Sequence, residues 1–451
     1  MTGRAQPGPV RLTAELAEFA SGLTWDQIPE SARHAARRTF VNVVGLAVDA
    51  CRHDAVEIAV ATLGDLGLRG RHPVLGRAET LTAAGAAFVN GMAMHVEDFD
   101  DTHLRTVIHP GSPVVPAALA AAELTNASGR DLLTAVTAGV EVACRVGNAL
   151  GPGHFDRGWH LTGTMGHLGA AVAAGRLLGL DATRMRHAVS LAATQAAGTT
   201  EQLGTMSKSM HPGKAAADGV EAALLAAAGF TGPDAPLEGR RGLAALSAPE
   251  PDLAEATREL GRAWEIEANA FKPYSCGIVS HPVIDAAIEL RDVLSGPEVI
   301  ESVDVVVRPV VLQVMGVEEP EDGLRSKFSV YHCFAVGFLD GGAGPAQYSD
   351  ARARDESVIA LRRKVRASTD PTMPKDACEV TVRTTGGATH RVSIAHATGS
   401  VDRPMSDERL RAKFDLLVGP RLGDRAAALW HAAWRIDERD EIGNLFGLSR
   451  W

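Results

Sequence analysis

The chain has 451 residues, which is more than one ordinary hydrophobic core holds and predicts two or three domains. Its 45 lysines and arginines against 55 aspartates and glutamates give a net charge of −10, which argues against nucleic acid as a partner. Alanine and glycine are abundant while aromatic residues make up only 5%, so we expect closely packed helices rather than a β-sandwich.

The cysteines and the lack of long apolar runs indicate in which cellular compartment the protein resides. The five cysteines are scattered and form no Cys-x-x-Cys pair, which predicts a reduced, cytoplasmic protein without a cysteine-held zinc or iron–sulfur site. The first residues lack the apolar stretch of a signal peptide, and no apolar run reaches the ~20 residues that span a bilayer. We therefore expect no targeting segment and no membrane partner.

Residues 12–263 show helical patterns joined by short loops. Pro29 begins one helix, and Thr80 begins another that leads into residues 90–111. Further alanine-rich helices are predicted at residues 113–124, 129–150, 162–178, 181–197 and 213–228. Glycines recur at positions 163, 166 and 169. They predict close helix packing rather than a phosphate loop, because no P-loop lysine or strand–turn–helix pattern accompanies them.

Residues 90–111 combine three histidines and four acids with an otherwise apolar pattern. If the segment is helical, His95, Asp98 and Thr102 lie on one face. A polar stripe inside an alanine-rich interior is costly unless it is hydrogen-bonded or used in chemistry. This stretch is therefore the first candidate for a functional site.

Two other interpretations of the same stretch remain open. Its carboxylates and imidazoles are suitable metal ligands, but HExxH and the further aspartate of DDxxD are absent, so we expect no metal. The second is structural: Asp100 or Asp101 caps the helix that follows the break.

Three further clusters each place a titratable side chain beside a turn or a helix start. They are His160 in residues 158–163, Lys208 and His211 in residues 206–214, and Lys272 and Tyr274 in residues 271–277, followed by His281. A lysine is usually solvated at the surface, but these turn-rich settings favour a site. Lysines and imidazoles that converge on a pocket suit a substrate with several carboxylates.

After residue 271 the pattern changes to a mixture of strands and helices. Residues 303–314 are rich in β-branched side chains and predict a strand, while residues 378–394 form two alternating runs joined at Gly386-Gly387, which predicts a hairpin. Helices are predicted at residues 281–294, 327–339 and 355–365, and again in the tail at residues 407–417 and 424–434. We expect that tail to pack back onto the first domain.

In order and spacing, these motifs together resemble the MmgE/PrpD family, a group that includes 2-methylcitrate dehydratase, cis-aconitate decarboxylase and iminodisuccinate epimerase. The matching motifs are Asn90-Gly91, Asp98-Phe-Asp-Asp-Thr102, His109-Pro-Gly, Gly158-Trp-His-Leu-Thr-Gly, Lys208 with His211-Pro-Gly, Gly229-Phe-Thr-Gly-Pro, Phe271-Lys-Pro-Tyr, His281-Pro, Lys327-Phe-Ser and Pro404-Met-Ser-Asp. The resemblance covers nearly the whole chain.

The resemblance implies a mostly α fold with an α+β second domain: a large helical domain of residues 1–268 together with 403–451, and a smaller α+β lid domain of residues 269–402. It also implies a homodimer and a pocket at the domain junction without a metal or organic cofactor. By motif, the active-site positions are Asp98, Thr102, His109, His160, Lys208 and Lys272. We add His95, His211, Tyr274 and Tyr331 as expected substrate-binding residues.

Two departures from the family pattern weaken a decarboxylase assignment. Where the decarboxylases resemble Lys-Pro-Phe-Pro-Ser-His, this chain ends the motif with Gly277. The tyrosine often found after Phe-Ser is also displaced, because His332 occupies its position and Tyr331 precedes it.

The chemistry shared across the family is proton transfer at a carbon next to a carboxylate. We expect Lys208, Lys272 and His109 to hold substrate carboxylates while His160 or Asp98 transfers the proton. The first choice is a dehydratase that acts on a hydroxy di- or tricarboxylate of the 2-methylcitrate type. The alternatives, in order, are an epimerase or racemase of a related dicarboxylate, a cis-aconitate-type decarboxylase, and a non-catalytic helical dimer that binds a carboxylate.

Overall fold

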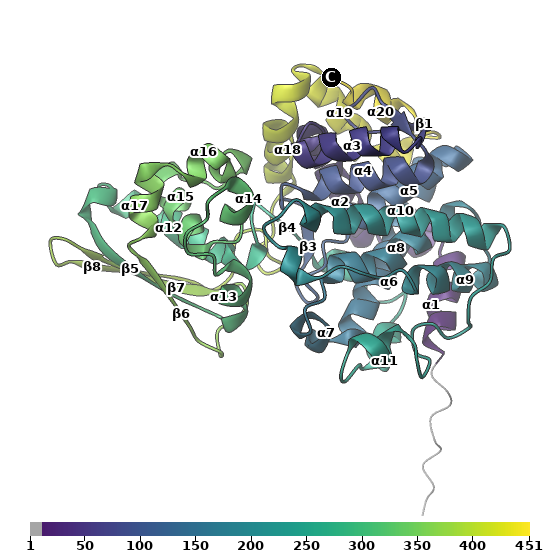
Figure 1. The fold of residues 1–451 in the computed structure, drawn as a ribbon, viewed down its shortest axis with the longest axis horizontal. Coiled ribbons are helices and arrows are strands. Elements are labelled where there is room, and N and C mark those ends of the chain that lie inside the picture. Colours follow the sequence, from purple (N-terminus) through teal and green to yellow (C-terminus); the bar gives the residue numbers. More distant parts are fainter. Residues whose placement is uncertain (1–10) are drawn as a thin grey trace, which may run out of the picture.

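The computed structural model describes residues 11–451, and its buried apolar side chains form two large cores. The first core draws on residues 12–271 and 405–446, and the second on residues 270–394. Figure 1 shows the two parts side by side, with the helical part on the right. The predicted fold class is confirmed: a mostly helical domain is followed by a domain with a mixed four-stranded sheet and helices.

Alanine-rich helices stacked on one another form the larger part. Its helices are α1 (Leu12–Gly22), α2 (Glu30–Ala50), α3 (Asp54–Asp65), α4 (Ala83–His95), α5 (Gly111–Thr125), α6 (Gly129–Leu150), α7 (Pro152–Asp156), α8 (Leu161–Leu177), α9 (Ala182–Ala193), α10 (Ser207–Ala227) and α11 (Leu243–Ser247). Two short antiparallel strand pairs accompany them: β1 (Arg69–Pro73) with β2 (Thr80–Leu81), and β3 (Asp101–His103) with β4 (Asn269–Phe271).

The glycine-rich start of α8 explains how these helices come so close. A Cβ on Gly166 would stand 2.9 Å from Pro113 of α5, and one on Gly169 would stand 2.7 Å from the carbonyl oxygen of Gly139 in α6. Both distances are below normal contact, so only glycine fits while the helices stay in place. The predicted close packing of this face is confirmed.

The tail lies against the helical part. Its helices are α18 (Asp407–Leu422), α19 (Arg425–Trp434) and α20 (Asn444–Ser449). They are drawn in yellow beside α2 and α3 in Figure 1, and Phe414 of α18 fills the space next to Gly45 of α2. The domain boundaries at residues 268 and 403 stay a prediction.

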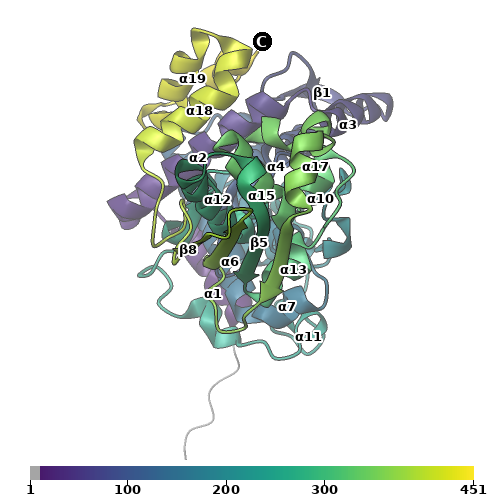
Figure 2. The ribbon, with the colours of Figure 1, turned by 90° about the vertical axis from the view of Figure 1, so that its left-hand side faces the viewer.

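The smaller part is a four-stranded sheet with helices packed on it. The strands are β5 (Ile300–Val307), β6 (Val365–Thr369), β7 (Cys378–Thr384) and β8 (Thr389–Ile394), in the order β6-β5-β7-β8 with only β5 and β6 parallel. The helices are α12 (His281–Val293), α13 (Pro309–Met315), α14 (Gly323–Ser326), α15 (Val330–Asp340), α16 (Asp350–Ala353) and α17 (Glu356–Arg362). Figure 2 looks onto this part, with the helical part behind it.

The predicted hairpin is confirmed, with Cys378 opposite Ile394 and the turn at Gly386-Gly387. The predicted strand at residues 303–314 is wrong in its second half. The strand β5 ends at Val307 and Pro309 begins α13, because proline has no N–H for a sheet ladder and its fixed φ suits the first turn of a helix. The predicted helix at residues 355–365 likewise ends at Arg362, and Val365 begins β6.

Among residues 11–451 no helix combines the length and the apolar character needed to cross a membrane.

Candidate active site

The turn that follows α4 organises the site. Helix α4 ends at His95, Asp98 adopts a left-handed φ of 51°, and Thr102 lies in strand β3. The expectation that His95, Asp98 and Thr102 line one helical face is therefore wrong. The helix does not continue because the carbonyl oxygens of Glu97, Asp98 and Phe99 accept hydrogen bonds from side chains instead of from helical amides.

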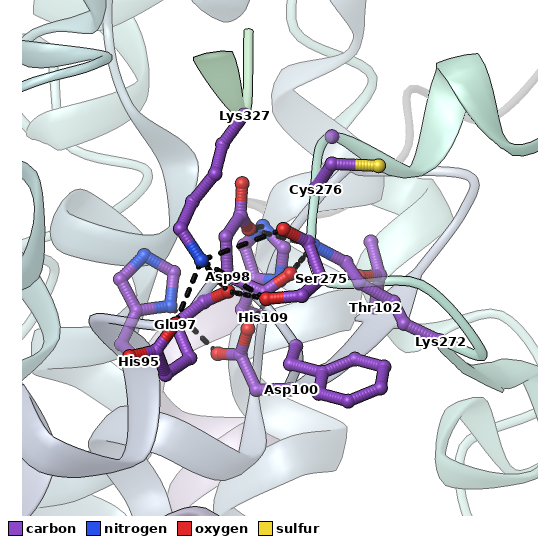
Figure 3. Close-up of polar contacts among 12 residues, drawn as sticks. His95, Glu97, Asp98, Asp100, Thr102, His109, Lys272, Ser275, Cys276 and Lys327 are labelled. Atoms are coloured by element: carbon purple, nitrogen blue, oxygen red, sulfur yellow. Dashed lines mark hydrogen bonds and ion pairs between the residues drawn. The ribbon is translucent and has the colours of Figure 1, made fainter. Parts of the chain in front are cut away.

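Three buried lysines hold these consecutive carbonyl groups. Lys327 Nζ donates to the carbonyl oxygen of Glu97 over 2.7 Å, Lys272 Nζ to that of Asp98 over 3.0 Å, and Lys413 Nζ to that of Phe99 over 2.6 Å. Figure 3 shows Lys327 and Lys272 reaching the turn from different sides. Because each buried ammonium group satisfies a carbonyl oxygen that the helix has released, the turn is fixed in one conformation.

Lys327 also links the two parts of the molecule. Its Nζ lies 2.8 Å from Glu97 Oε2 and donates to Ser275 Oγ over 2.9 Å, while Ser275 Oγ donates to the carbonyl oxygen of Glu97. Figure 3 shows these contacts meeting at one point beside the turn. The position of the α+β part is thereby tied to the residue that precedes Asp98.

The carboxylate of Asp98 is the most strongly held charge of the site. Lys272 Nζ lies 2.6 Å and Lys208 Nζ 3.0 Å from Asp98 Oδ1, and all three side chains are almost completely buried. Burial alone would raise the pKa of Asp98, but the two ammonium groups hold it well below its usual value. Asp98 is therefore ionised and a weak base. Its negative charge neutralises the two lysines, and it is poorly suited to removing a proton.

A second carboxylate, Asp100, orients two histidines. His95 Nδ1 lies 2.7 Å from Asp100 Oδ2, and His109 Nδ1 lies 3.3 Å from Asp100 Oδ1 and 3.1 Å from Thr102 Oγ1. Burial lowers the pKa of His95 to about 4 and also lowers that of His109. Both rings are thus neutral at pH 7. Asp100 stays ionised, because the two histidines counter the rise in pKa that its burial would cause.

His95, Asp100 and His109 bring potential metal-ligand atoms within 4.8 Å of one another. Their donor types suit a divalent ion, but the positive charge of Lys208 acts on both rings and disfavours a further cation there. The alternative structural role expected for Asp101 matches its contacts. Its Oδ2 accepts from the backbone N–H of Gly111 at the start of α5, over 3.2 Å.

His160 stands immediately before α8 and faces His211 of α10, with their Nδ1 atoms 2.8 Å apart. One ring therefore donates to the other, so at least one of the two carries its proton on Nδ1. Burial, followed by the charge of Lys208, lowers the pKa of His160 well below its usual value. The imidazole of His160 is therefore unprotonated at neutral pH and can accept a proton.

A cavity of about 500 Å³ opens between the two parts of the molecule. From the helical part it is lined by Asp98, His109, His160 and Lys208. The α+β part contributes a largely apolar wall that includes Gly277, Ile278, Val279, Val310, Val314 and Phe328. The loop before His109 adds Val107, whose φ of 60° is strained for a β-branched residue.

The remaining expected site residues lie behind or away from this cavity. Lys272, His95 and Thr102 contact its lining residues, and His211 contacts His160. Tyr274 donates to Asp285 Oδ1 over 2.6 Å, and Tyr331 packs against the second core. Neither tyrosine lines the cavity, so the geometry gives no support to their expected role in binding.

Sequence reasoning missed Lys327 and Lys413 as members of the site. Lys413 carried a signal, because it falls on the same helical stripe as Leu410, Phe414 and Leu417, all of which are buried. A lysine on an apolar stripe predicts a buried partner. Lys327 had only its place in the Lys-Phe-Ser motif, so its partner Glu97 was not foreseeable.

Comparison with known proteins gives matches across most of the chain. Residues 14–256 match the MmgE/PrpD N-terminal domain, and residues 274–437 match the MmgE/PrpD C-terminal domain. The chain is 31% identical over 345 residues to a cis-aconitate decarboxylase of Homo sapiens, which covers 73% of this chain and 71% of that protein. It is 28% identical over 440 residues to a cis-aconitate decarboxylase of Aspergillus terreus, which covers 90% of this chain and 89% of that protein.

Proposed function

The chain belongs to the MmgE/PrpD family, and on that premise we propose that it is a cofactor-independent lyase, most simply a dehydratase of a hydroxy di- or tricarboxylate. The observation that carries the proposal is the neutral His160 beside Lys208 in one cavity, with Asp98 balancing Lys208 and Lys272. This arrangement combines a proton acceptor with a fixed positive charge in a largely buried site.

Binding begins with a substrate carboxylate on Lys208, beside His109. The negative charge of the substrate raises the pKa of His160 towards neutrality, which opposes the effect of Lys208 and makes the imidazole a better base. His160 then removes the proton from the carbon next to that carboxylate. The electron pair moves into the carboxylate, where the charge of Lys208 stabilises the resulting dianion.

Dehydration completes when the electron pair returns to form a carbon–carbon double bond and the hydroxyl group on the neighbouring carbon leaves as water. The leaving hydroxyl needs a proton, which protonated His160 or a hydrogen-bonded neighbour supplies. Asp98 acts here as the counter-charge that keeps Lys208 and Lys272 in place. We assign the base to His160 rather than to Asp98 because two ammonium groups make Asp98 too weak a base.

The choice of dehydratase over decarboxylase rests on the space around position 277. A Cβ there would collide with Met315 Sδ of α13, so the histidine of the decarboxylase-like motif has no room unless Met315 moves. The named relatives are decarboxylases, which supports loss of carbon dioxide as a second candidate. An epimerase would use the same proton removal and reprotonate the opposite face.

Incubation of the enzyme with candidate acids in deuterated water, followed by NMR, tests the proposal. A dehydratase gives an alkene, an epimerase gives solvent deuterium at the reacting carbon, and a decarboxylase gives a product with one carboxylate fewer. If hydroxy di- and tricarboxylates give none of these changes while still binding, the protein is a carboxylate-binding dimer and the proposal fails.

We extend the proposal to a cytoplasmic homodimer. All five cysteines are free and buried, which supports a reducing compartment. Helix α10 exposes Met210 near its start and Leu224 and Leu225 near its end, and Met206 just before it is also exposed; pairing with a second copy would cover these apolar side chains. Light scattering after size-exclusion chromatography tests this, and a mass near 47.4 kDa at micromolar concentration would contradict it.

A further inference from the structure

Arg308 and Lys375 line the active-site cavity from the α+β part. The sheet brings them together. Arg308 directly follows β5, Lys375 lies in the loop just before β7, and Val306 of β5 pairs with Glu379 of β7. Arg308 Nη1 also donates to the carbonyl oxygen of Met373 over 2.8 Å, which ties its side chain to the loop that carries Lys375. Two cations are thus placed at one edge of the cavity by the pairing of two strands.

Neither cation is neutralised by the protein. Across residues 11–451, no carboxylate lies within ion-pair distance of Arg308 or Lys375. Asp156, an exposed residue of α7 that also lines the cavity, acts on Lys375 only through space. Burial and the charge of Arg308 lower the pKa of Lys375, so the two groups repel each other in a half-buried position. Such a pair is relieved when an anion binds between them.

Arg105 shows the contrasting case at the same cavity. Its Nη2 lies 2.5 Å from Glu255 Oε1, so its charge is already paired and it is mainly exposed. Apart from the site around Lys208, the cations of the cavity wall that lack a carboxylate partner within residues 11–451 are therefore Arg308 and Lys375.

Apolar side chains make up much of the cavity wall that these cations share with Lys208. Val310 and Val314 of α13 lie on the wall next to Arg308, and Phe328 lies over Lys208, whose Nζ is 5.5 Å from the ring centroid. At about 500 Å³ the cavity belongs to the size range that holds drug-sized ligands, which exceeds the need of a small acid bound at Lys208 alone. The cavity therefore has one cation at Lys208 and two at Arg308 and Lys375, in a wall that is largely apolar.

We propose that Arg308 and Lys375 bind a second substrate carboxylate, remote from the carbon at which the proton is removed, and that the substrate carries an alkyl segment between its two anionic ends. This inference rests on the proposed function for the identity of the reacting end. It narrows the substrate class to polycarboxylic acids with an alkyl chain between the two anionic ends. Arg308 and Lys375 select the substrate and take no part in proton transfer.

Binding of unreactive acids tests the second site separately from catalysis. Isothermal titration calorimetry compares straight-chain dicarboxylates from succinate to suberate with monocarboxylates of equal length on the full chain. The variants are Arg308→Gln, Lys375→Gln and the pair together. Arg366→Gln is the matched control, because Arg366 is an exposed arginine on β6 of the same sheet and does not line the cavity.

We expect the wild-type protein to bind a dicarboxylate of optimal length roughly tenfold or more tightly than the matching monocarboxylate, because the second carboxylate forms charge-assisted hydrogen bonds with Arg308 and Lys375. The double variant should lose this preference and Arg366→Gln should keep it. An unchanged preference in the double variant, or no preference in the wild type, would overturn the inference.

The test separates this inference from the proposed function. If the preference depends on Arg308 and Lys375 but no acid reacts in deuterated water, the second carboxylate site stands and the proposed lyase fails. If acids react but the double variant keeps both kcat and KM, the lyase stands and the second site is overturned. With a turned-over substrate, we expect the double variant to raise KM far more than it lowers kcat.

Discussion

Lys272 Nζ lies 2.6 Å from the carboxylate and 3.0 Å from the carbonyl oxygen of Asp98, so a single ammonium group fixes both the charge and the backbone of that residue. This double contact makes Lys272 as much a part of the fold as of the site. Replacing Lys272 with Met should lower the free energy of unfolding by about 3–5 kcal/mol, because it leaves a buried carboxylate with one partner fewer.

Equilibrium unfolding in urea measures this loss, and Asp98→Asn combined with Lys272→Met should recover part of it. Arg435→Met serves as the control. It opens an exposed ion pair with Glu438 and should change stability by less than about 1 kcal/mol. If Lys272→Met and Arg435→Met lowered the free energy of unfolding by equal amounts, the prediction would be contradicted.

Replacement of His160 with Gln should lower turnover by roughly a hundredfold or more while the fold stays intact, because glutamine cannot accept the substrate proton. His390→Gln is the control, since His390 lies on β8, far along the chain from the cavity and not among its lining residues. Steady-state kinetics with the acid identified by NMR gives the measurement. A near-normal rate in His160→Gln would remove His160 from the proton transfer.

Lys208→Met should move the acid limb of the pH profile of kcat/KM to higher pH. The reaction requires neutral His160, so activity falls as pH drops through the pKa of that ring. In the wild-type protein burial and Lys208 hold this pKa well below its usual value, and removal of the ammonium charge raises it. Residual activity measured from pH 4 to 9 checks the direction, and a limb that stays in place or moves to lower pH would argue against His160 as the group observed.

Gly277→Ala should be destabilising by about 1–3 kcal/mol, because a Cβ at this position collides with Met315 Sδ in a packed wall. Shortening Met315 to Ala removes the obstacle, so the double variant should be more stable than the two single losses together predict. A double-mutant cycle on urea unfolding gives the coupling energy. Additive losses would show that the side chain of Met315 turns aside freely.

Asp101→Asn should make the free energy of unfolding fall less steeply as the pH rises. Burial and the charge of Asp100 raise the pKa of Asp101 to about 8, against about 3.9 in an unfolded chain. The folded state therefore holds a proton that the unfolded state releases, and the stability this contributes is lost as pH rises from about 4 to 8. Relative to the wild type, Asp101→Asn should gain about 1.4 kcal/mol per pH unit across that window. Parallel stability curves from pH 5 to 9 would contradict this.

Local patterns predicted much of the fold but little of how the site is held. Helix starts such as the one after Pro29, the hairpin at Gly386-Gly387 and the close packing at Gly166 follow from residue types at short spacing, and the structure has all three. The strand across Pro309 failed because β-branched composition was given more weight than the missing N–H of proline.

At the site, the motifs identified side chains but not their partners. Lys208 and His160 were expected in a pocket, and both line the cavity. The end of α4 at His95 was not predictable, because it depends on Lys272, Lys327 and Lys413, which lie far along the chain from it. Contacts of that range leave no periodic signal in a sequence.

The contact of Lys413 with Phe99 joins residues 314 positions apart. During synthesis the turn at Asp98 cannot reach its final conformation until the residue that secures its last carbonyl has left the ribosome. Helices α4 to α10 are synthesised long before that point, so the nascent chain passes through a stage in which these helices exist while the turn and the part of the core that the tail supplies are unfinished. The tail thus acts as the final step of assembly, and a chain that stops before α18 should fold in part and remain inert.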